Sequence, residues 1–217
     1  MRVHTRFGTV ADGDLSIDSP EPGLTERRRA IVGLPWTWLR QVHGTDVVVV
    51  TAPGEHAGAA ADASVTAVAG AVLAVQTADC APVLLRSPEG VIGAAHAGWR
   101  GLADGVLATT VAAMSGLGAT DITAELGPCI APAGYEFAPA DLTTLAFRFG
   151  PDVVGVTGDG APAFDLRTAV RQALREVGVE LDPGWDEVAD TASDDRYFSW
   201  RARRDAGRQA SVIWVGP

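Results

Sequence analysis

The stretch Val91–Leu102, VIGAAHAGWRGL, passes from one type of local structure to another within a few residues. Val91–Ala95 is a run of small apolar residues, which is typical of a buried strand. His96 follows directly, and the glycines of Gly98–Gly101 allow a sharp turn before apolar residues begin to recur at helical spacing from Leu102. An imidazole at the end of a buried strand must find a polar partner. The sequence therefore predicts a polar site beside this strand end.

Strands and helices alternate irregularly around this stretch. We predict further strands at Val47–Val50, Ala71–Gln76, Pro82–Arg86, Ile122–Leu126 and Gln209–Val215, and helices at Leu102–Leu117, 139–149 and 166–177. This order is at least as typical of an α+β fold as of a doubly wound parallel sheet. Because no repeat or long linker interrupts the chain, we expect a single domain over residues 1–217.

Composition excludes several classes of partner. Hydrophobic residues make up 47% of the chain and charged residues 20%, as in globular proteins. The net charge of −10 disfavours nucleic-acid binding, because a polyanion would be repelled. The N-terminus lacks a signal-peptide core, and Gln76, Asp79 and Pro82 interrupt the most apolar stretch, so we expect no membrane partner. We expect a cytoplasmic protein whose two cysteines are free thiols.

Three bends beside apolar strands carry histidine, cysteine and other polar residues. They are Gln41–Gly44, Thr77–Cys80 and His96–Gly101. Side chains that project from several strand ends of one sheet can converge on a point. His43, Cys80 and His96 would then form a His₂Cys zinc site with one open coordination position. Zinc in such a site lowers the pKa of its bound water to roughly 7.

Other interpretations of these three residues stay open. The chain has no CxxC or HExxH motif, so His43 can be a turn histidine and Cys80 a small buried apolar residue. In a metal-free cysteine hydrolase, Cys80 would be the nucleophile and His96 or His43 the base. A multicopper oxidase would need more histidines than the four in this chain, so copper is less favoured than zinc.

The Gly98–Gly101 segment also fits an anion site. Glycines before a helix let the backbone approach a ligand, and the first-turn N–H groups favour a negative charge. Arg100 could add a forked contact to phosphate. The alternative is a solvated arginine beside a packing tryptophan.

Four motifs together resemble one known family. QVHG (41–44), TADCAPVLL (77–85), HAGWRG (96–101) and LGPCIAPAGYEF (126–137) are similar to the laccase-domain, or multicopper polyphenol oxidase, family. The similarity runs from about Gly33 to the C-terminus. Members of this family are regarded as zinc-dependent purine nucleoside phosphorylases with adenosine deaminase and methylthioadenosine phosphorylase activities. Bacterial members have also been described as peptidoglycan-editing factors.

The resemblance implies a function, a fold and a set of site residues. Its metal ligands fall on His43, Cys80 and His96, and its fold is a compact layered sandwich of two mixed sheets flanked by helices. It implies that purine nucleosides and phosphate are the substrates. We expect Arg100 to contact an anion, and Asp79 to be a proton shuttle or, preferably, a hydrogen-bonding support.

Two further expectations concern Gln41 and the C-terminal region. Gln41 would contact substrate or brace its loop. The chain departs from the family pattern near its C-terminus, at Asp190-Thr191, Phe198–Ala202 and Ala206. We expect the arginines from Arg196 to Arg208 to form a solvated basic surface paired with carboxylates. A zinc-stabilised module without enzymatic activity, for example one that acts on cell-wall precursors, is the remaining alternative.

Overall fold

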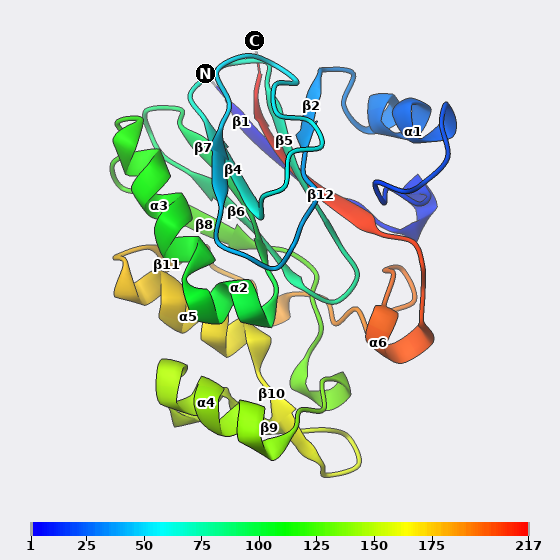
Figure 1. Cartoon of the computed structure of the whole chain (residues 1–217), viewed down its shortest axis with the longest axis vertical. Coiled ribbons are helices and arrows are strands. Elements are labelled where there is room, and N and C mark those ends of the chain that lie inside the picture. The colour runs from blue at the N-terminus through cyan, green and yellow to red at the C-terminus, as the bar shows by residue number, and fades with distance from the viewer. Residues whose placement is uncertain (1, 217) are drawn as a thin grey trace.

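Two mixed β-sheets stacked face to face form the centre of this protein, seen in a computed structural model that describes residues 2–216 (Figure 1). The first sheet has the strand order β1 (Val3–Phe7), β12 (Gln209–Val215), β5 (Val72–Thr77), β2 (Trp36–Trp38). The second has the order β11 (Glu180–Leu181), β8 (Thr123–Leu126), β6 (Ala81–Arg86), β7 (Ile92–Ala97), β4 (Ala63–Thr66), β3 (Val47–Val49). Each sheet contains both parallel and antiparallel pairs.

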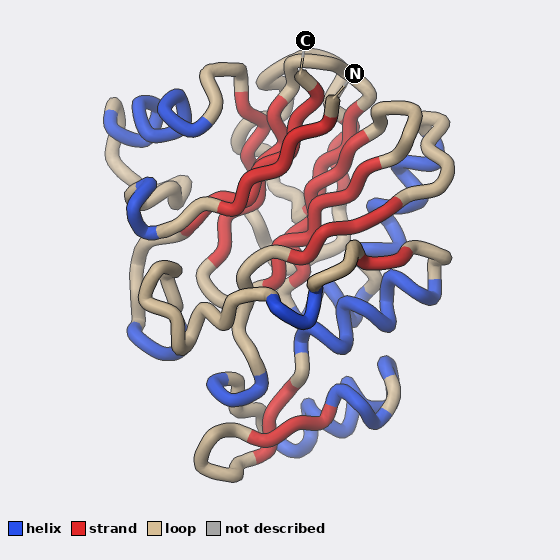
Figure 2. The backbone as a smooth tube through the Cα atoms, turned by 180° about the vertical axis from the view of Figure 1, so that it is seen from behind, coloured by secondary structure: helices blue, strands red, loops and turns tan. Residues whose placement is uncertain are grey.

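Helices cover the outer faces of both sheets, as the view from behind also shows (Figure 2). Helix α1 (Gly23–Ile31) lies against the first sheet. The second sheet is covered by α2 (Trp99–Asp104), α3 (Val106–Gly116) and α5 (Leu166–Glu176). Helix α4 (Pro139–Phe149) and the hairpin of β9 (Val154–Val156) and β10 (Pro162–Phe164) form a projection at one end. A short helix, α6 (Trp200–Arg203), precedes β12.

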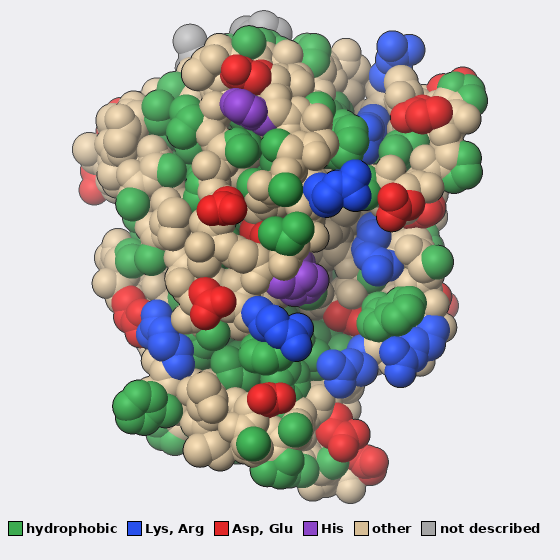
Figure 3. Space-filling model, in the orientation of Figure 1, with side chains coloured by type: hydrophobic (Ala, Val, Ile, Leu, Met, Phe, Trp, Pro, Cys, Tyr) green, Lys and Arg blue, Asp and Glu red, His purple; other side chains and the backbone are tan. Residues whose placement is uncertain are grey.

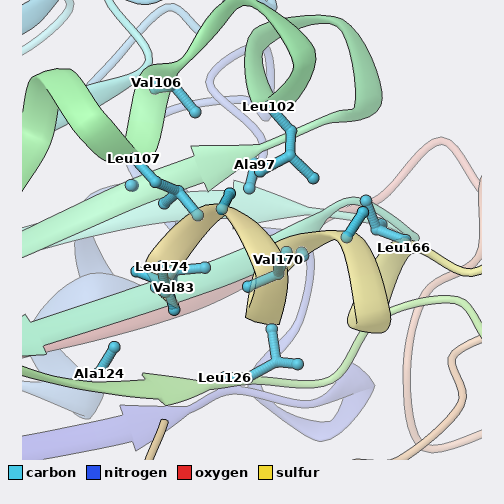
Figure 4. Close-up of a cluster of buried hydrophobic side chains, with 14 of the residues drawn as sticks. Val83, Ala97, Leu102, Val106, Leu107, Ala124, Leu126, Leu166, Val170 and Leu174 are labelled. Carbon is cyan, nitrogen blue, oxygen red and sulfur yellow. The ribbon is translucent and has the colours of Figure 1, made fainter. Parts of the chain in front are cut away.

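Three apolar clusters hold these layers together. The cluster between the two sheets includes Leu73 of β5 and Leu84 of β6, both fully buried. The largest cluster lies between the second sheet and its helices, where side chains of β6, β7 and β8 meet those of α2, α3 and α5 (Figure 4). The third packs α1 onto the first sheet. The order helix, sheet, sheet, helix confirms the predicted α+β sandwich with two mixed sheets flanked by helices.

Most predicted elements end within two residues of their observed bounds, and one predicted helix was wrong. The strand predicted to end at Ala95 continues through His96 to Ala97, because the β6 pairing extends to Ala97. The helix predicted over Leu102–Leu117 is two helices, and the first begins at Trp99. They are separated by Gly105, whose φ of 100° breaks the helical path.

Several elements were not predicted from the sequence. They are short strands or edge elements without clear periodicity: β1, β2, β4, β9, β10, β11, α1 and α6. Strand β4 has only four residues, ASVT, and its polar side chains are buried as fully as its apolar ones, so the sequence gives too little signal to predict a strand. Within residues 2–216, no helix combines the length and the apolar character that crossing a membrane requires.

We predict that the contact between the sheets contributes strongly to stability. Leu84→Ala should lower the free energy of unfolding by about 2–5 kcal/mol, because it leaves a cavity in the fully buried layer between the sheets. Urea unfolding followed by circular dichroism measures this change. Phe147→Ala is the control: this side chain is 95% exposed on α4, and its loss should stay within about 0.5 kcal/mol. Equal effects of the two substitutions would contradict the layered core.

Candidate active site

The side chains of His43, Cys80 and His96 converge at one point. Their ligand atoms all lie within 4.8 Å of one another, and no other such group of three occurs in residues 2–216. The Cys80 Sγ lies 3.8 Å from the His43 Nε2. The two imidazole rings meet edge to face with centroids 4.8 Å apart. Two nitrogens and one sulfur in this arrangement are a donor set that suits zinc.

Strand pairing brings Cys80 and His96 together. In the antiparallel pair of β6 and β7, Ala81 lies opposite Ala97 and Pro82 lies opposite His96. Cys80 directly precedes β6 and Gly98 directly follows β7, so Cys80 lies beside Gly98, two residues from His96. The bend that contains His43 reaches the same point from the segment between β2 and β3.

Asp62, which is fully buried, holds two of the three candidate ligands in place. Its carboxylate accepts backbone N–H bonds from Val42 (3.1 Å), His43 (2.9 Å) and Gly44 (2.7 Å). A carboxylate oxygen also lies 2.8 Å from the Nδ1 of His96. An ionised carboxylate only accepts, so this Nδ1 carries a proton and the other ring nitrogen, Nε2, is left for a ligand.

Two candidate-site bends contain non-glycine residues in a left-handed conformation. His43 has a φ of 61° and Asp79 a φ of 98°. Such conformations cost about 1–3 kcal/mol each and persist only where the surrounding structure enforces them. For His43, the three backbone bonds to Asp62 supply that enforcement. Strained residues of this kind cluster at functional sites.

The glycines of the Gly98–Gly101 segment allow two parts of the chain to pack closely. A Cβ on Gly98 would lie 2.5 Å from the His43 ring, and one on Gly101 would lie 2.6 Å from the backbone oxygen of Gly44. Both contacts are too close for any side chain. Helix α2 has only six residues, so it is too short to act as an anion site by itself. The glycines allow the bend with His43 to approach β7.

The electrostatic environment favours an ionised Cys80. Burial opposes ionisation of this thiol, but the neighbouring His96 and His43 imidazoles outweigh burial and lower the pKa to about 6. For His96, burial lowers the pKa, but Cys80 and Asp62 outweigh it and raise the pKa to about 9. The thiolate is the form of cysteine that binds a metal ion or attacks a substrate. A metal ion would displace the imidazole proton.

The candidate ligands line a cavity of about 790 Å³, within the size range of small-molecule sites. On the face of the molecule that Figure 3 shows, a histidine lies near the centre with basic side chains around it. The other prominent lining residues are polar or aromatic: Asp14, Ser16, Asp18, Gln41, Gln76, Thr77, Trp99, Arg100, Tyr135, Trp200, Arg201 and Arg208. The cavity therefore combines three candidate metal ligands with cations and aromatic rings.

Of the other predicted site residues, Gln41 and Arg100 line the same cavity, whereas Asp79 is buried next to Cys80 and does not line it. Gln41 lines the cavity, and its amide donates to the Gln76 carbonyl oxygen and accepts from the Gln76 N–H, both at 2.7 Å. Asp79 is buried, and its carboxylate accepts from the Thr191 hydroxyl (2.7 Å) and the Arg201 N–H (2.6 Å). Both side chains thus hold neighbouring segments together.

Arg100 lies exposed at the cavity with its guanidinium 4.3 Å from the centre of the Trp99 ring. Within residues 2–216 its guanidinium has no hydrogen-bond or ion-pair partner. This arrangement combines the two alternatives considered from the sequence: a packing tryptophan and a cation that stays free for an anion.

The C-terminal arginines are not simply a solvated surface. Arg203 donates to the Thr191 and Ala192 carbonyl oxygens, both at 3.1 Å, and pairs with Asp205. Arg201 donates to the Glu136 carbonyl oxygen at 2.9 Å. The predicted carboxylate pairing is confirmed for Arg196, which pairs with Asp194 at 2.6 Å, and for Arg203. Arg201, Arg203 and Arg208 also donate to backbone oxygens, because loops without regular structure leave those oxygens unpaired.

Cys129 takes no part in the cavity wall. Its thiol is fully buried, and burial raises its pKa to about 12, so it is an unreactive thiol of the core. Neither cysteine forms a disulfide. Asp190, where the family often has cysteine, instead accepts the Ala131 N–H at 2.9 Å.

Asp62 was not identified as a site residue from the sequence. The sequence did contain a signal for this residue. Asp62 is the one charged residue in Ala57–Val65, which otherwise consists of alanine, glycine, serine and valine. A carboxylate in a buried strand must be compensated by donors, and such residues are often functional. The importance of Trp200 at the cavity also became clear only from the structure.

Comparison with known proteins is consistent with this geometry. A purine nucleoside phosphorylase of Streptomyces griseus is 43% identical over 96% of this chain and 88% of its own length. A purine nucleoside phosphorylase of Escherichia coli is 38% identical over 91% of this chain and 83% of its own length. A crystal structure of a Neisseria meningitidis protein superposes with a TM-score of 0.84 at 30% identity, covering 99% of this chain and 95% of the other. Residues 7–216 match the family described as multi-copper polyphenol oxidoreductase laccase, and the chain belongs to that family.

Proposed function

We propose that this protein is a zinc-dependent purine nucleoside phosphorylase. The observation that carries the proposal is the convergence of His43, Cys80 and His96 in the wall of a cavity that also presents the free guanidinium of Arg100. The names of the relatives support the choice of substrate, because both carry the name purine nucleoside phosphorylase. The cavity is large enough for a nucleoside together with phosphate.

The donor set favours one zinc ion over a copper cluster. A multicopper cluster needs many histidines, and the two remaining ones lie elsewhere: His4 stacks on Trp214, and His56 lies beside Glu55. A mononuclear blue-copper site usually adds an axial methionine to His₂Cys. No methionine is among the described residues that line the cavity. Zinc accepts two imidazoles and one thiolate with a fourth position open.

The proposed reaction breaks the bond between the purine and the ribose. A phosphate oxygen attacks the anomeric carbon, the electron pair of the glycosidic bond leaves with the base, and the base takes up a proton. The products are ribose 1-phosphate and the free purine. The role of Arg100 is to hold phosphate beside the sugar and to offset the charge that develops in the transition state. A bound zinc ion would supply Lewis-acid chemistry in the same cavity.

Asp79 and Gln41 act mainly by positioning in this proposal. Asp79 directly precedes Cys80, and its carboxylate accepts the Arg201 N–H, so this bond joins the bend that contains Cys80 to α6. Gln41 joins the bend that contains His43 to the end of β5 through its two bonds to the Gln76 backbone. Each residue therefore fixes a segment that carries a candidate ligand, and Gln41 also presents its side chain to substrate from the cavity wall.

The proposal extends to two further reactions on adenosine-type substrates. Methylthioadenosine has the same glycosidic bond, so it would undergo the same phosphorolysis. Adenosine deamination at C6 would use water activated in the metal site. The two reactions differ in their products: phosphorolysis gives the free base and a sugar 1-phosphate, whereas deamination of adenosine consumes water and gives inosine and ammonia without any phosphate.

A metal-free cysteine hydrolase is the second candidate. The 3.8 Å contact between Cys80 Sγ and His43 Nε2, with the lowered Cys80 pKa of about 6, is also what a nucleophile beside its base would show. The two candidates differ in their metal content. They also differ in their sensitivity to chelators and to alkylation.

The first test is a nucleoside panel. Inosine, guanosine, adenosine and methylthioadenosine are incubated with purified protein, with and without phosphate, and the products are separated by chromatography. We expect free base and a sugar 1-phosphate only when phosphate is present: ribose 1-phosphate from the three ribonucleosides and methylthioribose 1-phosphate from methylthioadenosine. We also expect about one zinc per chain by mass spectrometry. Cys80→Ala should abolish turnover without loss of the fold, because it removes one of three ligands. Cys129→Ala, which removes the other thiol outside the cavity, should keep both zinc and activity.

Three results would contradict the proposal. Metal-free protein that turns over a substrate and is blocked by iodoacetamide would favour the cysteine hydrolase. If no nucleoside is converted and Cys80→Ala lowers the melting temperature, the site is a zinc-stabilised binding module, for example a peptidoglycan-editing factor. Stoichiometric copper together with phenol oxidation would favour the polyphenol oxidase activity that the family description names.

A second prediction concerns Asp62. Asp62→Asn cannot accept all four hydrogen bonds, so the bend that contains His43 and the His96 ring should both lose their fixed positions. We expect zinc affinity to fall roughly 10–100-fold, measured by competition with a chromophoric chelator. Asp46→Asn is the matched control, because the Asp46 carboxylate is exposed in the loop that contains His43. Unchanged affinity in Asp62→Asn would show that the site forms without this support.

A further inference from the structure

Trp200 places a half-exposed indole in the wall of the cavity. It is the first residue of α6 and is 48% exposed, whereas the large apolar side chains of the core are fully buried. Exposing an aromatic ring of this size to water is unfavourable unless a ligand or partner covers it. Trp200 lines the same cavity as the three candidate metal ligands, so a ligand bound in this cavity could cover the ring.

The other aromatic rings of the cavity already have partners. Trp99 packs edge to face on Phe137 at 5.6 Å and carries the Arg100 guanidinium. Tyr135 is 6% exposed, packs edge to face on Phe137 at 4.8 Å and carries the Arg201 guanidinium. Trp200 has no aromatic neighbour among the described residues, and its one stacked group is Arg204, 5.4 Å from the ring centre. Of these rings, Trp200 offers the most accessible surface.

The backbone beneath Trp200 is held firmly. Ser199 is fully buried, its side chain caps α6 by accepting the Ala202 N–H, and its own N–H is donated to Asp205 at 2.8 Å. Asp79 accepts the Arg201 N–H and so connects the helix to the residue next to Cys80. The indole is thus attached to a segment with a fixed position relative to the candidate metal ligands. A ligand would find this surface already in place.

We propose that Trp200 is the stacking platform for the purine base, an inference that rests on the proposed phosphorylase function. Stacking of a base on an aromatic ring contributes about 1–3 kcal/mol and depends on the π-face rather than on hydrogen-bonding groups. The site therefore recognises the bicyclic ring system shared by all purines. Inosine and guanosine gain equally from this contact, whereas the smaller ring of a pyrimidine nucleoside gains less.

Calorimetric binding of inosine, guanosine and uridine without phosphate tests this inference. Trp200→Ala should raise the Kd of inosine and of guanosine by the same factor, about tenfold, and should leave zinc content unchanged. Trp200→Leu, which keeps apolar bulk but no π-face, should weaken binding in the same way. Trp200→Phe should restore most of the affinity, and wild-type protein should bind uridine more weakly than either purine nucleoside.

Trp185→Ala is the matched control. Trp185 also carries an arginine, Arg171, 4.3 Å from its ring centre, but it does not line this cavity. Its substitution should leave all three Kd values unchanged. Melting curves for every variant establish that the fold is retained.

The possible results separate the two proposals. If wild-type protein converts purine nucleosides but Trp200→Ala and Trp200→Leu bind them as tightly as wild type, stacking is wrong and the phosphorylase function stands. If the substitutions weaken inosine but not guanosine, recognition of exocyclic groups replaces stacking. If wild-type protein neither binds nor converts any nucleoside, the proposed function fails and this inference fails with it.

Discussion

The buried carboxylate of Asp62 is the constraint on which the candidate site depends. It lies at the start of β4 with no exposure to water, and burial of a charge is costly unless several donors compensate it. The chain supplies three backbone N–H groups from Val42 to Gly44 and the Nδ1 of His96. Although burial raises its pKa, these bonds outweigh burial and lower the pKa of Asp62. One side chain therefore sets the conformation of one candidate ligand and the orientation of another.

The packing around this carboxylate explains several residues that otherwise look unrelated. The bend that contains His43 can approach β7 only because Gly98 and Gly101 have no side chains. On the other side, Asp79 connects the strand end beside Cys80 to α6. The two sheets supply a rigid frame, since β6 and β7 pair along their whole lengths and are packed on both faces. Function is thus concentrated in bends that the frame holds in fixed positions.

The long, periodic elements could be predicted from the sequence, whereas the short ones could not. The segments now seen as α4, α5 and β12 have clear patterns, and their predicted bounds are nearly those observed. Strand β4 has only four residues and is buried throughout, so local periodicity carries no signal. The break at Gly105 was also missed, because a single glycine within a helical pattern is often tolerated.

The candidate site shows the same division. His43, Cys80 and His96 could be selected because their residue types are unusual beside apolar strands and match a family pattern. The support by Asp62 depends on pairing between β4 and β7, which sequence spacing does not reveal. The contact of Gly98 and Gly101 with the bend that contains His43 could not be read from the sequence either, because that bend lies more than 50 residues earlier in the chain. Contacts between distant segments decide such roles.

The central claim is that two imidazoles and one thiolate from distant parts of the chain hold a single zinc ion. Anomalous diffraction from crystals grown with zinc, recorded just above and just below the zinc absorption edge, tests it most directly. We expect one zinc peak between the Nε2 atoms of His43 and His96 and the Sγ of Cys80. Absence of a peak at that point, with the three side chains turned apart, would contradict it.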